Sequence, residues 1–342
     1  MSRLPLAAVR VVELDAGVAG ARCARLLGDL GAEVIKIERP TPTASANALR
    51  FDLDRNKLGC VIDTADERGR ALLLRLARLS QVAVAAFDGA GPSADELREA
   101  KRDLIIVSLP PPDESPALED LTPGTAAAAG VLVALVKHRR TAAGSLVALR
   151  RDALAASFRG ELALRSPPVH PTVSDAPCGC FPCRQDGLVA ISTSGNHEFA
   201  ALCNVIGRPD LRADPRFDNA ASRIENETEL RRHVESWTTA CHADEAARSL
   251  QEACVRAAPV LSPDALRQDR HLRQGGFLEL VAHTEGEREV ARLPWRFGGT
   301  PVHTRLPAPL PGEHNAYVFR ELLRLSGAEI ADLSSAGVIG GV

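Results

Sequence analysis

Asp120 is the side chain whose type and position best suit chemistry, because the residues that follow it, 121–136, have helical composition and carry no charge. An aspartate before such a helix either caps the helix N-terminus, which is worth about 1 kcal/mol, or takes part in chemistry through its carboxylate. Backbone N–H groups at the helix start, over 121–125, are suited to stabilise negative charge that develops nearby. Both interpretations of Asp120 follow from the residues alone.

A second group of residues could hold a nucleotide. Gly17 and Gly20 lie between a strand-like run and a helix-like run, and Glu38 ends the next strand-like run. This is Gly-x-x-Gly and not the full Gly-x-Gly-x-x-Gly of a dinucleotide site, so a tight strand-to-helix turn is the simpler interpretation. Lys36 and Arg39, at the end of the second strand, could bind phosphate or could be solvated. The three phosphate groups of a coenzyme A nucleotide suit this place better than NAD does.

The only clustered cysteines are Cys178, Cys180 and Cys183. A structural zinc site needs four ligands, usually as two spaced pairs. The nearest further candidate is His170, and no second pair follows. We therefore expect reduced thiols in a turn before a strand, and no metal.

The positions of these residues depend on alternating strands and helices. Apolar runs of strand length occupy 9–14, 32–38, 82–87 and 104–109. Helical spacing at 19–30 ends before Gly31, a second helix follows a capping-box pattern at Thr64 and Glu67, and a third follows Ser93 and Glu96. This alternation predicts an α/β fold with a doubly wound parallel sheet, whose ligand binds beyond the carboxyl ends of the strands.

The later sequence predicts a second, smaller α+β domain. Composition divides the chain into a first part of a large domain (1–166), a linker rich in Pro, Ser and Cys (167–186), a small domain (187–275), and a linker with a return to the large domain (276–342). No long low-complexity tract interrupts these segments.

Composition also limits the partners. A net charge of −3 and an aromatic content of 4% disfavour binding to nucleic acid. No apolar run approaches the roughly 20 residues that span a bilayer, and the N-terminus lacks the apolar stretch of a signal peptide. We expect a cytoplasmic protein that binds neither nucleic acid nor membrane.

Several blocks of the sequence resemble one family, the family III CoA-transferases (CaiB/BaiF type), which includes formyl-CoA transferase, carnitine CoA-transferase and α-methylacyl-CoA racemase. Residues 4–40 resemble the family's N-terminus, and residues 51–87 resemble its next block, with an Asn-Lys pair before a strand and a later strand that ends in Phe. Residues 120–144 resemble the helix led by its catalytic aspartate, and 207–217 and 307–314 match later signatures.

The resemblance implies a Rossmann-like large domain, a small domain, and an interlocked homodimer. It implies no prosthetic group, with coenzyme A and acyl-CoA as substrates and a carboxylic acid as acceptor. Asp120 would be the nucleophile that forms a covalent aspartyl intermediate. The implied coenzyme A contacts are Arg39 with phosphate, Ile62 and Phe87 near the adenine end, and Val18 and Ala19 along the thioester channel.

The sequence departs from the family pattern in one pocket. The segment between residue 111 and Asp120 is several dozen residues shorter than in the family, and no histidine precedes His138, which argues against a racemase. Val18 stands where formyl-CoA transferase has glutamine, and Ala86 replaces a common asparagine. The alternatives are therefore a catalytically silent coenzyme A-binding paralogue or a partner subunit of a full-length relative, and, on the Gly-x-x-Gly feature, an NAD-dependent oxidoreductase.

Overall fold

The structure is a computed structural model that describes residues 4–14, 17–40, 49–87, 91–109, 118–150, 153–154, 176–297 and 300–340. For residues 118–121, 300 and 301 it describes the backbone alone. The chain divides into two compact units, one formed by residues 1–161 with 274–342 and the other by 162–273.

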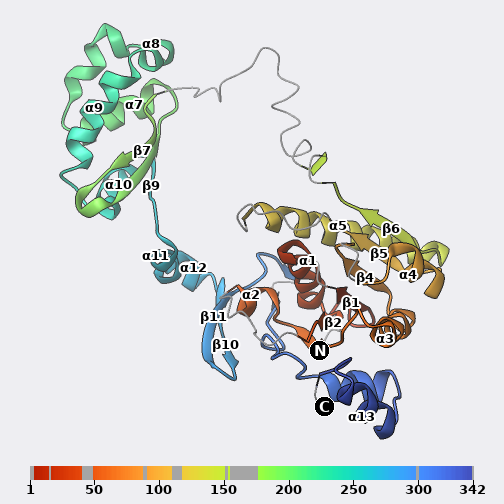
Figure 1. The fold of residues 1–342 in the computed structure, drawn as a ribbon. Helices are drawn as coiled ribbons and strands as arrows, with labels where there is room; N and C mark the ends of the chain where they lie inside the picture. The colour runs from red at the N-terminus through yellow and green to blue at the C-terminus, as the bar shows by residue number, and fades with distance from the viewer. Residues whose placement is uncertain are drawn as a thin grey trace. The chain divides into compact units, whose positions relative to one another are not determined.

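The first unit is built on a parallel sheet of six strands, shown in Figure 1. In spatial order the strands are β3 (Lys57–Val61), β2 (Glu33–Glu38), β1 (Arg10–Leu14), β4 (Val82–Ala85), β5 (Ile105–Ser108) and β6 (Ser145–Ala148). Neighbouring residues such as Val11 and Val12 are both fully buried although they face opposite sides of the sheet. Strands covered on both faces require the continuous apolar runs seen in the sequence. The predicted doubly wound α/β sheet is confirmed.

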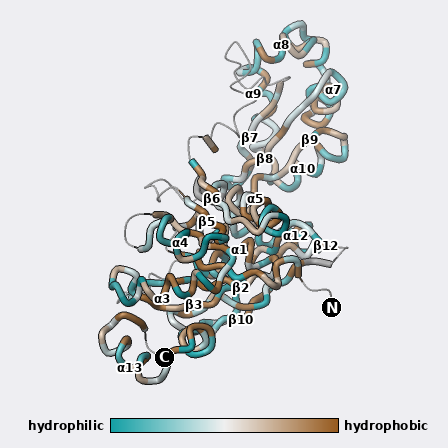
Figure 2. Tube along the Cα trace, turned by 90° about the vertical axis from the view of Figure 1, so that its right-hand side faces the viewer, coloured by the Kyte–Doolittle hydropathy of each residue, from teal (hydrophilic) through white to brown (hydrophobic). Residues whose placement is uncertain are grey.

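Helices cover both faces of this sheet. They are α1 (Gly17–Asp29), α2 (Arg50–Leu53), α3 (Glu67–Arg78), α4 (Ala94–Ala100) and α5 (Leu118–Thr141). Apolar residues of α1 and α5 pack together on one face, in a cluster that includes Leu27, Val84 and Val131. Helices α3 and α4 pack on the opposite face. The hydrophobic colouring of the central strands in Figure 2 follows this layered core.

The predicted helix ends are confirmed at two places and wrong at two others. Helix α1 ends before Gly31, and Ser93 forms a complete capping box with Glu96 at the start of α4. Helix α3 is capped by Asp66, whose side chain accepts from Arg68 N, and not by the predicted Thr64. Asp66 has the extended backbone of an N-cap and lies directly before the first helical residue, which places its carboxylate within reach of that N–H.

Helix α5 begins one turn earlier than predicted. It starts at Leu118, so Asp120 is the third helical residue and not the residue before the helix. Pro123 lies inside the helix. Aspartate favours the position before a helix, and this preference placed the predicted start too late.

The C-terminal part of the first unit packs against the sheet. It contains the hairpin β10 (Leu278–His283) and β11 (Gly286–Ala291), the short strands β12 (Arg296–Phe297) and β13 (Thr300–Pro301), a helical stretch η4 (Tyr317–Leu322), and α13 (Gly327–Ser335). Val318 and Phe319 of η4 and Ile330 of α13 join the apolar cluster on the α3 face of the sheet. This segment therefore completes the core of the first unit.

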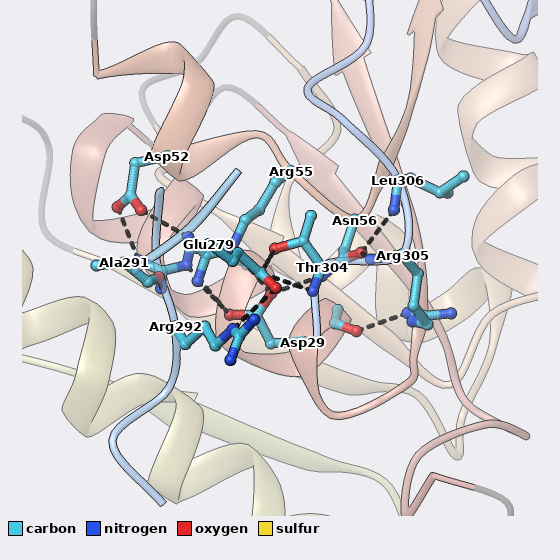
Figure 3. A network of polar contacts seen from close by, with 12 residues as sticks. Asp29, Asp52, Arg55, Asn56, Glu279, Ala291, Arg292, Thr304, Arg305 and Leu306 are labelled. Atoms are coloured by element: carbon cyan, nitrogen blue, oxygen red, sulfur yellow. Dashed lines mark hydrogen bonds and ion pairs between the residues drawn. The ribbon is translucent and has the colours of Figure 1, made fainter. Parts of the chain in front are cut away.

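A buried polar network joins the start of the first unit to this C-terminal part, as Figure 3 shows. Asn56 donates to Asp29 Oδ1 over 2.6 Å, and its Oδ1 accepts from the backbone N–H groups of Arg305 (2.7 Å) and Leu306 (3.0 Å). Arg55 donates to Asp29 and Asp52. Asn56 has a φ of 60°, a left-handed conformation that asparagine tolerates better than most residues. One asparagine thus holds two chain segments that are distant in sequence.

The second unit has its own core around an antiparallel sheet, with the order β7 (Cys178–Pro182), β8 (Leu188–Ser192) and β9 (Arg256–Pro259). Its helices are α7 (Gly195–Val205), α8 (Ala220–Glu225), α9 (Glu227–Thr238), α10 (Ala243–Glu252), α11 (Pro263–Gln268) and α12 (Arg270–Gln274), with short helical turns η1 (Arg184–Asp186), η2 (Pro209–Ala213) and η3 (Pro215–Phe217).

Residues 178–182, assigned to the linker from their composition, instead form strand β7. Phe181 explains the difference, because its ring is buried in the apolar cluster of this unit and anchors the strand. Cys178 and Cys180 therefore lie on a strand, and not in a turn before one. Among the described residues, no helix is both long and apolar enough to cross a bilayer.

Candidate functional site

The residues predicted to form the site gather at one edge of the six-stranded sheet. Each follows the carboxyl end of a different strand: Val18 and Ala19 after β1, Arg39 after β2, Ile62 after β3, Phe87 after β4, and Asp120 after β5. Strands β1 and β4 are neighbours, and the chain leaves them for helices on opposite faces of the sheet, α1 and α4. A crevice opens at such a switch point, where α/β proteins bind their ligands. The predicted site residues thus follow the strand ends at which the sequence analysis expects a ligand, and their roles stay a prediction.

Helices α1 and α5 touch near their starts, where Gly124 in the second turn of α5 meets Ala19 and Arg22 of α1. A Cβ atom placed on Gly124 would lie 2.4 Å from the carbonyl oxygen of Ala19 and 2.7 Å from Cβ of Arg22. The two backbones can approach this closely only because residue 124 has no side chain. The start of α5 is therefore fixed directly beside the start of α1.

Asp120 lies four residues before Gly124 on α5, which places it one turn further toward the helix N-terminus on the same face. Its side chain is outside the described residues, so its catalytic role stays a prediction. The backbone position already puts this aspartate at the α1 side of α5. The first four N–H groups of a helix have no partner within the helix, so both helix starts present free donors and the positive end of a helix dipole here.

Helix α1 begins directly at the predicted Gly-x-x-Gly sequence. Gly17 has a φ of 59°, a conformation that residues with side chains rarely adopt, and it is the first residue of the helix. Val18 is partly exposed, and Ala19 is buried with 6% of its surface exposed. No acidic residue occurs in the first turn of α1. This turn can therefore receive an anionic group without like-charge repulsion.

The other predicted coenzyme A contacts differ in accessibility. Arg39 follows β2 directly and is partly buried, and Phe87 is partly buried against the apolar cluster of α4 and β5. Ile62 is fully buried, because the C-terminal segment covers it and Ile339 pairs with its backbone. The Ile62 side chain therefore packs in the core, and no surface of it is open to a ligand in this structure.

Lys36, considered as a phosphate ligand, is instead engaged in ion pairs. Its Nζ lies 2.7 Å from Asp54 and 3.0 Å from Glu38. Glu38 is thus occupied as well, which leaves little support for the ribose contact of a dinucleotide. Burial alone would raise the pKa of Asp54, but the charges of Lys57 and Lys36 outweigh it and hold that pKa below its usual range.

The buried thiol and carboxyl groups near the site are not suited to act as nucleophiles in place of Asp120. Burial raises the pKa of the Cys23 thiol of α1 to about 12, and it raises that of Cys60 as well, so neither is a thiolate at neutral pH. Glu13 of β1 is 3% exposed, pairs with Lys57 over 2.7 Å, and has a pKa raised by burial. None of the three side chains is accessible to a thioester.

Two further features bear on ligands. A cavity of about 600 Å³ lies at the amino ends of β5 and β6, at the opposite edge of the sheet from the predicted site, and Arg98, Arg102 and Lys137 line it. These cations lie at or just beyond the C-terminal ends of α4 and α5, where positive charge offsets the helix dipole.

Within the described part of the chain, no group of three His, Cys, Asp or Glu side chains could hold a metal ion.

The sequence analysis missed two residues that shape the site, Arg22 and Gly124. Gly124 follows a proline within the helical run, and a glycine there signals a close backbone approach. Arg22 lies at helical spacing from Val18 and Ala19, which places it on the same face of α1. Neither signal identifies the partner helix.

Comparison with known proteins agrees with this arrangement. The family model described as CoA-transferase family III matches residues 6–111 and 109–315. The two matches meet at residues 109–111, in the connection from β5 to α5, where the sequence predicted that a family segment is missing.

Named relatives span the full chain. Succinyl-CoA–D-citramalate CoA-transferase of Chloroflexus aurantiacus is 27% identical, with 98% of each protein covered. That alignment has 396 positions and is longer than this chain, so the relative carries stretches that this chain lacks. Formyl-CoA:oxalate CoA-transferase of Streptomyces avermitilis is 25% identical, with 98% of this chain and 99% of the relative covered.

Solved structures share the fold. A CaiB/BaiF family protein from Brucella suis superposes with a TM-score of 0.81 at 22% identity, and covers 94% of this chain and 100% of its own. The protein Rv3272 from Mycobacterium tuberculosis superposes with a TM-score of 0.77 at 26% identity, with 91% of this chain and 98% of that chain covered.

Proposed function

The chain belongs to CoA-transferase family III, and we propose that it moves coenzyme A from an acyl-CoA thioester to a carboxylic acid, with Asp120 as the covalent acceptor. The observation that carries the proposal is the contact at Gly124, which fixes the turn that bears Asp120 beside the first turn of α1 at the switch point of the sheet. A carboxylate on that turn would lie near two helix starts, whose first N–H groups have no partner within their own helix and could stabilise an oxyanion.

The proposed reaction begins when a carboxylate oxygen of Asp120 attacks the carbonyl carbon of the thioester. The C–S bond breaks, which gives a mixed aspartyl anhydride and free coenzyme A thiolate. The thiolate then attacks the aspartyl carbonyl and releases the first acid as a carboxylate, leaving an aspartyl-CoA thioester.

The incoming acid attacks this thioester through its own carboxylate, the C–S bond breaks, and a new anhydride and free coenzyme A thiolate result. The thiolate finally attacks the new acyl carbonyl, which yields the product acyl-CoA and regenerates the Asp120 carboxylate. Each step exchanges one acyl bond for another, so the reaction consumes no redox equivalents.

The chain's other residues would serve binding and charge stabilisation. Backbone N–H groups of Val18 and Ala19, in the first turn of α1, would stabilise the oxyanion together with those of residues 118–121 of α5. Arg39 would bind a phosphate of coenzyme A at the end of β2, and Phe87 would contact the nucleotide at the end of β4. Ile62 would support this pocket from beneath, since its own surface is buried.

The relatives suggest which substrates to test first. Their names specify succinyl-CoA with D-citramalate, mesaconate or glutarate, and formyl-CoA with oxalate. Apart from formyl-CoA, these substrates are dicarboxylic acids or the CoA thioester of one. We infer that the acceptor of this chain is a small dicarboxylic acid, and that the chain acts in the cytoplasm as a homodimer.

Mass spectrometry of the intact protein tests the proposal. The protein is incubated with a panel of short acyl-CoA donors and then treated with hydroxylamine, which converts an aspartyl anhydride or thioester into a stable hydroxamate. We expect a mass shift that peptide mapping assigns to Asp120 and that Asp120→Asn abolishes. An adduct elsewhere, or an equal adduct in Asp120→Asn, contradicts the role of Asp120.

A catalytically silent coenzyme A-binding paralogue is the second candidate, because the family match breaks directly before α5. Coenzyme A binding in calorimetry without any adduct or exchange would favour it. If the protein neither binds coenzyme A nor exchanges it, both candidate functions are contradicted.

A further inference from the structure

Arg22 is a charged residue close to the proposed site that no structural contact explains. It is partly buried on α1, and its Nε atom is buried without a hydrogen-bond partner among the described residues. Arg25, one turn further along, differs in this respect: it donates to Asp29 (3.2 Å) and Asp52 (2.7 Å). A buried N–H without an acceptor costs roughly 1–3 kcal/mol, so an arginine in this state favours the binding of an external acceptor.

The Arg22 side chain leans toward the proposed site. Its Cβ and Cγ lie 2.7 and 3.0 Å from the position of a Cβ on Gly124, so the side chain starts at the contact between α1 and α5. Side chains on helices lean toward the helix N-terminus. Helices α1 and α5 both start at the carboxyl edge of the sheet, so this direction leads toward the turn that bears Asp120. About 6 Å of helix rise separates Gly124 from Asp120, within the length of an extended arginine.

We propose that Arg22 binds the carboxylate of the substrate that does not react, which makes the chain selective for dicarboxylic acids and their CoA half-thioesters. This inference rests on the proposed function, because it needs the reacting carboxyl group to be at Asp120. The guanidinium is planar and always charged, and it pairs with a carboxylate through two parallel hydrogen bonds. Arg22 is then a specificity-determining residue.

The local charges support an anionic ligand. The first turn of α1 contains no acidic residue. Both helix starts add partial positive charge at the same place. A substrate with two carboxylates would place one at Asp120 for reaction and the other at Arg22, and the distance between them would limit its chain length.

The test compares acceptors that differ only in the second carboxylate, for example glutarate and pentanoate. The variants are Arg22→Met, which keeps the length and removes the charge, Arg22→Lys, which keeps a charge, and the control Arg78→Met. Arg78 is an exposed arginine in the last turn of α3, and its loss changes net charge equally. Thermal denaturation of each variant shows that it is folded.

For Arg22→Met we expect kcat/KM with glutarate to fall about 10- to 100-fold, the equivalent of one charge-assisted hydrogen-bonded pair. The value for pentanoate should remain unchanged, Arg22→Lys should recover part of the loss, and Arg78→Met should match the wild type. Equal losses for both acids, or no loss for either, would overturn the inference while the transferase reaction stands. If the wild type exchanges neither acid with any donor, the proposed function fails, and the inference fails with it.

Discussion

Gly124→Ala is the most direct test of how the fold positions the site. The added Cβ would lie 2.4 Å from the carbonyl oxygen of Ala19, and the oxygen belongs to the backbone of α1, which cannot rotate away. Ordinary contact begins near 3.4 Å, so α1 and α5 must separate locally by about 1 Å. The turn that bears Asp120 would then move relative to the first turn of α1.

The effect on stability should be modest, because two contributions oppose each other. Overpacking of this kind costs about 2–3 kcal/mol, and the higher helix propensity of alanine returns about 1 kcal/mol. The net loss of about 1–2 kcal/mol corresponds to a decrease in Tm of about 2–8 °C for a unit of this size. The effect on activity should be larger, since a displacement of 1 Å between reacting groups costs about 100-fold in rate.

Gly130→Ala is the matched control in the same helix. Its added Cβ would meet only a terminal methyl group of Val147, at 2.7 Å, and that side chain can move. We therefore expect Gly130→Ala to keep the wild-type kcat, and Gly124→Ala to lose about 100-fold in kcat for exchange of CoA at 25 °C, where both are folded. Wild-type kcat in Gly124→Ala would refute the idea that this contact sets the reacting geometry. An equal loss in Gly130→Ala would indicate a general effect of packing in α5.

Two further predictions concern stability. Asn56→Ala should lower the free energy of unfolding by about 3 kcal/mol or more in urea denaturation, because it removes the side-chain hydrogen bonds to Asp29, Arg305 and Leu306. Glycine suits the left-handed backbone at this position, so Asn56→Gly should lower the free energy of unfolding by about 1 kcal/mol less than Asn56→Ala does. Equal decreases in the two variants would show that backbone strain at residue 56 does not contribute to the loss in Asn56→Ala. Asp54 has a lowered pKa in the folded state, so its stabilising contribution is complete above about pH 4 and is lost as the pH falls below that value. The stability difference between wild type and Asp54→Asn should therefore narrow from pH 7 to pH 3, and a constant difference would contradict the ion pairs with Lys36 and Lys57.

The sequence predicted those features of the fold that depend on neighbouring residues. The apolar runs of β1, β2, β4 and β5 and the Ser93–Glu96 capping box are local patterns, and each is confirmed. The start of α5 was predicted one turn too late, because Asp120 also suits the position that caps a helix start. Strand β7 was missed because its sequence is rich in Pro, Gly and Cys, a composition typical of loops. The burial of Phe181 nevertheless stabilises it as a strand.

The sequence predicted that the candidate site lies at a set of strand ends, but it did not predict which residues of α1 and α5 contact one another there. Parallel strands bring their carboxyl ends to one edge, so Val18, Arg39 and Phe87 could be placed together from the pattern alone. The importance of Gly124 and Arg22 arises where α1 meets α5, roughly 100 residues apart in sequence, and no local pattern encodes that contact. The ion pair of Lys36 with Asp54 joins residues 18 positions apart, and the residue pattern around Lys36 does not reveal it.

The pairing of Asn56 with Leu306 has a consequence for how the protein is made. Two hydrogen bonds join these residues across 250 positions of the chain. At about 5–20 residues per second, a ribosome would deliver Leu306 roughly 12 to 50 s after Asn56. During that interval the second unit, a contiguous stretch, can complete its own core, while the sheet of the first unit still lacks the segment that covers its α3 face. The nascent protein would thus expose Ile35 and Ile62 until synthesis is nearly complete, which makes the unfinished first unit a natural client for chaperones.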